Sequence, residues 1–217
     1  SRAADRAPEG GMMDPGEGNL TEIRLHGRGG QGTVVCSLML ARAAMLEGRS
    51  VQSFPEFGVE RRGAPVNAYL RVSDRPIRLR CRVYLPDHVM VLDPQLLRQV
   101  ELPAGRPGWL VVNTAADPAS LSAPEPWRAA AVDATRIARA NGLGGGAFPI
   151  VNSPMAGAFA RATGLVGLPA LLAAIREFAP SGAEQNAAAA QEAWEAVRLS
   201  RGRHAEGLSR GLGGAAP

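Results

Sequence analysis

The sequence contains no lysine, only two cysteines and no long apolar run. All 24 residues of the lysine and arginine class are arginines, so the phosphate-binding lysine of a P-loop is missing. Cys36 and Cys81 stand outside any C-x-x-C spacing, and two thiols cannot supply the four that usually hold an iron–sulfur cluster. Every apolar run is shorter than the roughly 18 residues of a membrane span. We therefore expect a cytoplasmic protein without a membrane span or a metal site of its own.

Motifs of nucleophilic and zinc catalysis are also scarce. No H-x-x-x-H spacing occurs. The single H-x-E, at residues 204–206, and the single G-x-S-x-G, at residues 207–211, lie in the C-terminal tail. A nucleophile elbow needs a strand before it and a helix after it, and a zinc deaminase needs a C-x-x-C. We expect no catalytic residue in this chain.

The charge balance is positive, with a net charge of +4 and a pI near 10.0. Such a balance would suit a nucleic-acid partner. Aromatic residues make up only 5% of the chain, however, and do not alternate with the arginines. Since no recognition motif for nucleic acid is present either, we expect no such partner.

The composition favours one folded domain with loose ends. Of the 217 residues, 46% are hydrophobic and 20% are charged, which is typical of a globular protein. Residues 1–20 contain Gly, Pro and charges without an apolar core, and residues 202–217 offer little to bury. We expect a flexible extension over residues 1–20, a domain over residues 21–201 and a flexible tail over residues 202–217.

Hydrophobic periodicity predicts an α/β fold. Continuous apolar runs, typical of strands covered on both faces, alternate with segments of helical spacing. Strands are expected at residues 21–26, 50–54, 88–93, 108–113 and 129–135. Helices are expected at residues 33–47, 155–163, 168–179 and 183–199. This order predicts a mostly parallel, Rossmann-like sheet flanked by helices.

Residues 64–85 alternate between apolar and polar positions. The alternation predicts an antiparallel hairpin insert, with its two strands joined at Ser73-Asp74. Arg78, Arg80 and Arg82 share one face of the second strand. A row of like charges is costly unless something anionic meets it, although a solvated sheet face is the alternative.

The stretch RLHGRGGQGTVV, residues 24–35, combines a strand end, a glycine turn and a helix start. Gly27, Gly29 and Gly32 have the G-x-G-x-x-G spacing of dinucleotide-binding folds. Such a fold expects an acidic residue at the end of its second strand, whereas here that strand is expected to end at Phe54 and Glu56 to lie in a loop. Contact with an anion or a partner, a purely structural turn, and NAD or FAD binding remain the alternatives.

A second informative loop covers residues 54–65 and contains Arg61 and Arg62. Paired arginines suit bidentate contact with phosphate or carboxylate, while a solvated loop with a salt bridge to Glu60 is the alternative. Because ligands gather beyond the carboxyl ends of parallel strands, we expect four segments at one edge. These are the glycine turn, this loop, the loop after Asp93 and the loop near Asn152.

Several long motifs in order carry a family resemblance. They are IRLHGRGGQGTV, SFPEFGVERRGAPVNAYLRVS, PIRLRCRVYLPDHVMVLDPQLL, VDATRIA, PIVNSPMAGAFARATG and AEQNAAAAQEAW, within residues 22–199. The pattern resembles the gamma subunit, or gamma domain, of the 2-oxoacid:ferredoxin oxidoreductases. Pyruvate:ferredoxin oxidoreductase, also called pyruvate synthase, is the most similar-looking member.

The resemblance implies an enzyme that decarboxylates a 2-oxoacid on thiamine diphosphate with Mg²⁺ and forms an acyl-CoA. Two electrons pass through iron–sulfur clusters to ferredoxin or another acceptor. In the family these tasks are divided among alpha, beta, gamma and ferredoxin-like delta subunits. The gamma part binds neither the thiamine nor a cluster, which agrees with the absence of a G-D-G thiamine motif here. In the family it lies near the entry of coenzyme A.

The resemblance and the charge pattern together give a candidate contact site. We expect its residues to face coenzyme A or the alpha and beta subunits. They are Gly27, Gly29, Gly30, Gln31, Gly32, Arg61 and Arg62. A free-standing NAD-dependent enzyme and a binding module for an acidic protein are the alternative functions.

Overall fold

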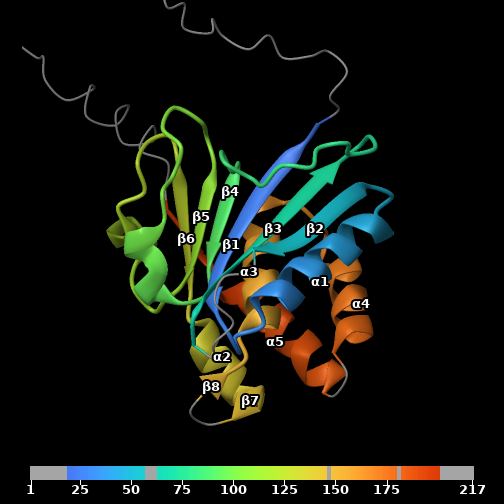
Figure 1. The fold of residues 1–217 in the computed structure, drawn as a ribbon. Coiled ribbons are helices and arrows are strands. Elements are labelled where there is room, and N and C mark those ends of the chain that lie inside the picture. Colours follow the sequence, from blue (N-terminus) through green and yellow to red (C-terminus); the bar gives the residue numbers. More distant parts are fainter. Residues whose placement is uncertain (1–18, 57–62, 146–147, 180–181, 201–217) are drawn as a thin grey trace, which may run out of the picture.

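The computed structural model describes residues 19–56, 63–145, 148–179 and 182–200. Arg61 and Arg62, the predicted tail and nearly all of the predicted N-terminal extension lie outside these ranges. A seven-stranded sheet faces the viewer in Figure 1, with helices packed behind it. Its strands are β1 (Thr21–Arg28), β2 (Ser50–Glu56), β3 (Pro65–Ser73), β4 (His88–Val91), β5 (Trp109–Asn113), β6 (Arg128–Val132) and β9 (Arg198–Leu199).

Helices follow the strands largely where helical spacing places them. The α-helices are α1 (Thr33–Leu46), α2 (Ala134–Ala140), α3 (Asn152–Thr163), α4 (Leu168–Phe178) and α5 (Ala183–Ala196). Two short 3₁₀ helices, η1 (Pro94–Gln99) and η2 (Pro118–Leu121), follow β4 and β5. A separate two-stranded ribbon, β7 (Gly144–Gly145) with β8 (Phe148–Pro149), precedes α3.

Five of the seven strands of the main sheet run in one direction. The order across the sheet is β2-β3-β1-β4-β5-β6-β9. Strands β1, β4, β5 and β6 pair in parallel, whereas β3 is antiparallel to both of its neighbours and β9 is antiparallel to β6. β2 therefore runs the same way as β1. The predicted α/β class with a mostly parallel sheet is confirmed.

The antiparallel insert is a hairpin of β2 and β3, in which Ser50 pairs with Ser73 and Glu56 with Asn67. The predicted second arm of the hairpin is wrong, because residues 74–87 form no strand. We call these residues the strap. They cross the face of the sheet, so alternate side chains turn toward the sheet or toward solvent without a ladder of hydrogen bonds. Burial follows this pattern in part: Val83 is buried and Arg82 is exposed, but Cys81 is exposed as well.

The larger core lies between the sheet and helices α1, α3, α4 and α5. Ile23 and Leu25 of β1 point into it from one side, and Phe159 of α3 from the other, all fully buried. Helices α3 and α5 pack closely because position 157 is glycine. A Cβ at Gly157 would lie 2.0 Å from the carbonyl oxygen of Ala190.

The opposite face of the sheet has two different halves. Over β4 and β5, Val91, Leu110 and Trp127 form a smaller core with residues of η1 and the loops beside it. Over β1, β3 and β2, the outward side chains are mostly polar and include Arg24, His26 and Asn67, beside the ring of Phe54. The strap crosses this polar half (Figure 1).

Candidate functional site

The glycine turn continues directly from β1, which extends through Gly27 to Arg28 rather than ending at residue 26. The amide of Gln31 donates to the carbonyl of Arg28 at 3.1 Å, and the Gln31 side-chain oxygen accepts from the Arg28 amide at 2.8 Å. Gly30 and Gly32 have φ values of +99° and +81°, in the region that side chains with a Cβ disfavour. The turn is therefore held by Gln31 and permitted by these two glycines.

Gly27 is required for a different reason, namely close packing. A Cβ at this position would lie 2.1 Å from Thr33 Oγ1. At Gly32 a Cβ would lie 2.7 Å from Nδ2 of Asn152, at the start of α3. The turn is thus pressed against the first residues of both α1 and α3.

Helix α1 begins at Thr33 with no side-chain cap, and its first intrahelical bond runs from the Cys36 amide to the Gly32 carbonyl at 2.8 Å. Its first amide groups have no intrahelical acceptor. The Thr33 hydroxyl, on a residue only 3% exposed, has no hydrogen-bond partner among the described residues. Free amides, a buried hydroxyl and the positive end of the helix dipole suit an anionic group.

Two neighbouring loops contact the turn. Arg28 Nε donates to Asp93 Oδ2 at 2.6 Å, after β4, and Arg28 Nη1 donates to the carbonyl of Gly63 at 3.1 Å. The Gly29 amide also donates to the carbonyl of Ala64 at 3.0 Å. The glycine turn, the end of the loop that follows β2, the loop after Asp93 and the region of Asn152 therefore share one edge, as expected. We call residues 27–33, with Asp93 and Asn152, the glycine edge.

Buried amide side chains support this edge; the sequence predicts the region of Asn152 here but not Asn113. Asn113, at the end of β5, donates to the carbonyl of Leu92 at 2.9 Å and to the hydroxyl of Thr135 at 3.0 Å. Asn152 Oδ1 accepts from the amide of Ser153 at 2.8 Å. These bonds join the ends of β4 and β5 to α2 and stabilise the start of α3.

His26 lies just before the turn, on the polar half of the sheet, and is only 9% exposed. Burial, and secondly the charge of Arg24, lower the pKa of His26 to about 4. Its Nε2 atom is buried without a partner among the described residues. The imidazole is therefore neutral at pH 7.

Glu56 is the last residue of β2, so its expected place in a loop is wrong. Its carboxylate accepts from the Tyr69 hydroxyl at 2.5 Å, from Asn67 Nδ2 at 3.0 Å and from Arg82 Nη1 at 3.0 Å. The bonds from Tyr69 and then Asn67 lower the pKa of Glu56. Burial, together with this bond, raises the pKa of Tyr69 to about 12.

The sheet order bears on the dinucleotide alternative. In a dinucleotide-binding fold the ribose-binding acid ends the strand beside the glycine-turn strand. Here β3 separates β1 from β2, and the Glu56 carboxylate is occupied by three neighbours. Asp93, which follows β4 on the other side of β1, is bonded to Arg28 and to the Gln95 amide. Neither Glu56 nor Asp93 is thus free to bind a ribose at the glycine turn.

Other features of the described residues give no second candidate. No group of three or more His, Cys, Asp or Glu residues there is placed to bind a metal. Cys36 is buried in α1, where burial raises the pKa of its thiol, and Cys81 is exposed on the strap. None of the helices within those residues is both long and apolar enough to cross a membrane. A hollow of about 200 Å³ under η1 and η2 is lined mainly by leucines and has no ionisable group.

Comparison with known proteins gives this geometry a context. Residues 22–196 match the family model described as pyruvate ferredoxin/flavodoxin oxidoreductase. The chain belongs to this family. The resemblance found in the sequence is thereby confirmed.

Individual relatives agree over nearly their whole length. The chain is 46% identical to the pyruvate/ketoisovalerate oxidoreductases common subunit gamma of Pyrococcus abyssi, over 83% of this chain and 98% of that protein. It is also 46% identical to the pyruvate synthase subunit PorC of Methanothermobacter marburgensis, over 83% and 99%. It is thus a gamma-type accessory subunit within the pyruvate ferredoxin/flavodoxin oxidoreductase family.

The fold matches a solved member of the same family. The crystal structure of pyruvate oxidoreductase subunit PORC from Thermotoga maritima aligns with a TM-score of 0.70 and 38% identity. The alignment covers 84% of this chain and 99% of the other. The α/β sheet described above is therefore the fold of this oxidoreductase subunit.

Proposed function

We propose that this chain is the gamma subunit of an enzyme that oxidatively decarboxylates pyruvate, or a related 2-oxoacid, to its acyl-CoA. The substrate loses CO₂, its two electrons pass to iron–sulfur clusters and then to ferredoxin or another acceptor, and the acyl group is transferred to coenzyme A. The end-to-end similarity to gamma subunits of pyruvate oxidoreductases carries this proposal.

The cofactors of that reaction belong to the partner subunits. Two cysteines, one buried and one on the strap, do not fit an iron–sulfur cluster that takes four thiolates. Thiamine diphosphate, Mg²⁺ and the clusters are accordingly held by alpha, beta and ferredoxin-like delta subunits. This chain supplies surfaces for assembly and for coenzyme A, in the cytoplasm.

The glycine edge is the surface that coenzyme A or a neighbouring subunit approaches. Its backbone is free of side chains at Gly29 and Gly30, and Gly30 has open space where a Cβ would be. The buried hydroxyl of Thr33 and the first amides of α1 can donate to a phosphate or a carboxylate. Arg61 and Arg62, together with Gln31 and the glycines, complete the proposed contact set.

The experiment is kinetic and uses the assembled enzyme, purified through a tag on another subunit. Thr33→Val keeps the shape of the side chain but removes the hydroxyl, and Arg61→Ala with Arg62→Ala removes two charges. Each variant is expected to raise the KM for coenzyme A by about tenfold, the value of one or two lost hydrogen bonds to an anion, while the KM for the 2-oxoacid stays unchanged. Thr114→Val, on an exposed turn after β5, is the control.

Two results would contradict the proposal at different levels. If both variants assemble normally and leave the KM for coenzyme A unchanged, the glycine edge does not bind it. If the wild-type chain recovers no thiamine-dependent partner from its own cells, the assignment as a gamma subunit fails.

A further inference from the structure

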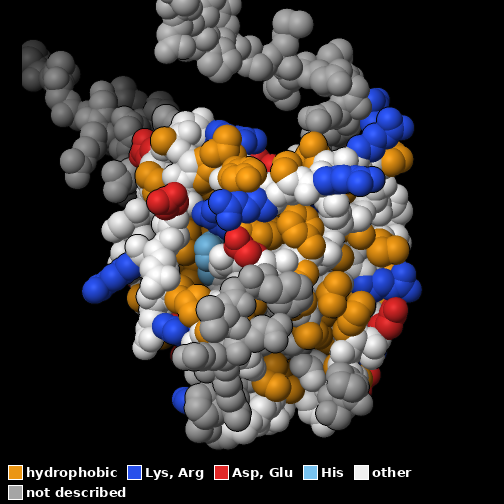
Figure 2. Space-filling view, in the orientation of Figure 1, with side chains coloured by type: hydrophobic (Ala, Val, Ile, Leu, Met, Phe, Trp, Pro, Cys, Tyr) orange, Lys and Arg blue, Asp and Glu red, His pale blue; other side chains and the backbone are white. Residues whose placement is uncertain are grey.

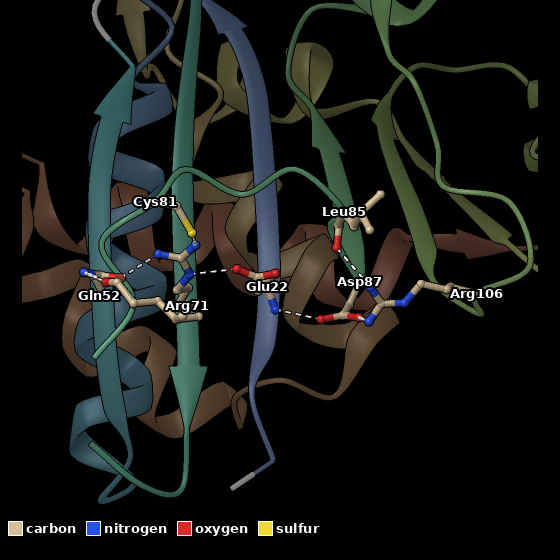
Figure 3. Close-up of polar contacts among 8 residues, drawn as sticks. Glu22, Gln52, Arg71, Cys81, Leu85, Asp87 and Arg106 are labelled. Atoms are coloured by element: carbon tan, nitrogen blue, oxygen red, sulfur yellow. Dashed lines mark hydrogen bonds and ion pairs between the residues drawn. The ribbon is translucent and has the colours of Figure 1, made fainter. Parts of the chain in front are cut away.

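The strap is tied to the sheet by a buried arginine, shown in Figure 3. Arg71 of β3 is completely buried; its Nε donates to Glu22 of β1 at 2.7 Å and its Nη1 to Gln52 of β2 at 2.8 Å. Its Nη2 lies 3.7 Å from Sγ of Cys81 on the strap. One cation thus fixes the strap above three strands.

A second anchor holds the end of the strap. Asp87 accepts from the backbone amide of Glu22 at 2.8 Å and from Arg106 Nη2 at 2.8 Å. Arg106 also reaches the carbonyl of Leu85, at 3.4 Å. These contacts lie near the start of β1, about 20 Å from the glycine edge at a rise of about 3.3 Å per residue. The strap is therefore a separate surface with a fixed position.

The outward face of the strap is a row of arginines. Arg78 and Arg80 are exposed and form no hydrogen bond or ion pair with any other residue that the structure describes. Arg82 is exposed too, but it pairs with Glu56 at 3.0 Å and lies over the ring of Tyr84 at 4.9 Å. Two exposed cations thus have no counterion among the described residues, beside a third that is paired with Glu56.

Large apolar side chains stand next to this row. Tyr84 is 62% exposed and Leu85 is 55% exposed, although both lie on an anchored segment. Figure 2 shows arginine and apolar side chains mixed across the upper part of this face. Arginine and tyrosine are the residues that protein interfaces favour, and they often dominate the binding energy.

Most backbone groups in the middle of the strap are unpaired among the described residues, although the carbonyl of Leu79 accepts from Gln52 Nε2 at 3.0 Å. Residues 77–84 form no backbone–backbone hydrogen bond with any described part of the chain. Their alternating sequence would suit a strand, yet none of the described strands pairs with them. Unpaired backbone groups with alternating side chains are what a peptide or strand from another chain can join.

We propose that the strap is the docking surface for an acidic segment of another subunit of the same complex. Carboxylates of that segment meet Arg78 and Arg80, its apolar side chains cover Tyr84 and Leu85, and its backbone pairs with residues 77–84. A second copy of this chain does not fit, because two arginine rows would face one another and like charges directly opposite are destabilising. The proposal rests on the proposed function only in requiring that partner subunits exist.

Hydrogen exchange tests the pairing. Amides of residues 77–84 are compared in the full chain alone and in the purified complex. We expect exchange in this segment to slow by at least tenfold on assembly, since paired amides open rarely. Equal rates in both samples would overturn the proposal, and so would protection in the isolated chain that grows with its concentration, which indicates self-association.

Charge reversal tests the chemistry. The strap variant carries Arg78→Glu and Arg80→Glu. The control variant carries Arg98→Glu and Arg139→Glu, the same charge change at two other exposed arginines. The strap variant is expected to weaken binding to the partner subunits about 100-fold, and the control variant less than threefold.

The outcomes separate the two proposals. Normal assembly of the strap variant overturns the docking proposal and leaves the gamma-subunit assignment intact, whereas failure of the wild-type chain to assemble removes both.

If the wild-type chain binds a DNA duplex at physiological salt and the strap variant does not, the partner of the strap is nucleic acid and the proposal of an acidic protein segment is overturned. If the strap variant lowers the melting temperature of the isolated chain, Arg78→Gln with Arg80→Gln is used in its place. That variant is expected to weaken binding to the partner subunits at least tenfold.

Discussion

At the scale of single residues, two buried groups next to the glycine turn have unsatisfied polar atoms. One is Thr33, whose hydroxyl is unpaired behind Gly27, and the other is His26, whose Nε2 has no partner among the described residues. An unpaired buried polar group costs about 1–3 kcal/mol. For Thr33 we propose that a ligand supplies the missing partner. At His26, burial disfavours the protonated form of the imidazole.

The buried imidazole of His26 makes stability depend on pH. Its pKa falls from 6.5 to about 4 on folding, so the unfolded chain binds the proton more tightly. The stabilisation is present above pH 6.5 and is lost as pH falls toward 4, by about 3 kcal/mol. His26→Gln should remove most of this slope in urea unfolding measured between pH 7 and pH 4.5.

The control for this prediction is His88, whose pKa is also lowered by burial. His88→Gln should remove a separate part of the slope, and the double variant both parts. A His26→Gln chain with the wild-type slope would show that His26 does not titrate as its burial requires.

The sequence predicted the residues of the glycine turn but not all of their roles. G-x-G-x-x-G spacing identified Gly27 and Gly32 because glycine is informative wherever backbone must pass closely. The supporting Asn113 was missed because a lone asparagine after a strand has many equally ordinary roles. The prediction for Glu56 is wrong because the strand is expected to end at Phe54, before Pro55, whereas it continues through Pro55 to Glu56.

At the scale of elements, the contact between α3 and α5 depends on Gly157. Since a Cβ there would lie 2.0 Å from the Ala190 carbonyl oxygen, Gly157→Ala must push the helices apart. We expect a loss of about 2–4 kcal/mol of unfolding free energy, measured by urea unfolding of the full chain.

A second Gly→Ala variant, at a position with open space, serves as the control for packing. At Gly145 a Cβ would meet nothing within 4 Å, so Gly145→Ala should change stability by less than about 0.5 kcal/mol. If Gly157→Ala were as mild as Gly145→Ala, the two helices would not be in the close contact described.

Elements with a strong internal pattern were predictable. Continuous apolar runs gave β4, β5 and β6, and helical spacing gave the four long helices. The prediction of a strand within the strap is wrong, because an alternating sequence indicates which side chains are buried and not whether the backbone is hydrogen-bonded in a sheet. The short strand β9 was missed since its two residues have no periodicity and depend on the edge of β6.

At the scale of the whole molecule, strand order separates the alternative functions. With β3 between β1 and β2, Glu56 does not end the strand beside the glycine-turn strand, and the carboxylate that contacts the turn, Asp93, is already bonded to Arg28 and to the Gln95 amide. The isolated full chain should therefore show no NAD binding at 1 mM by calorimetry, while thermal stability should rise when partner subunits are added. Micromolar binding of NAD would restore the alternative of a free-standing dehydrogenase.

The position of β3 also constrains the order in which the chain can fold. Residues paired between β2 and β3 lie 11 to 23 positions apart in the sequence, whereas those paired between β1 and β3 lie 37 to 51 apart. Closing the shorter loop costs less entropy, so we expect the hairpin to form first and then to dock on β1 as a unit. Refolding speed should thus be set largely by that late docking.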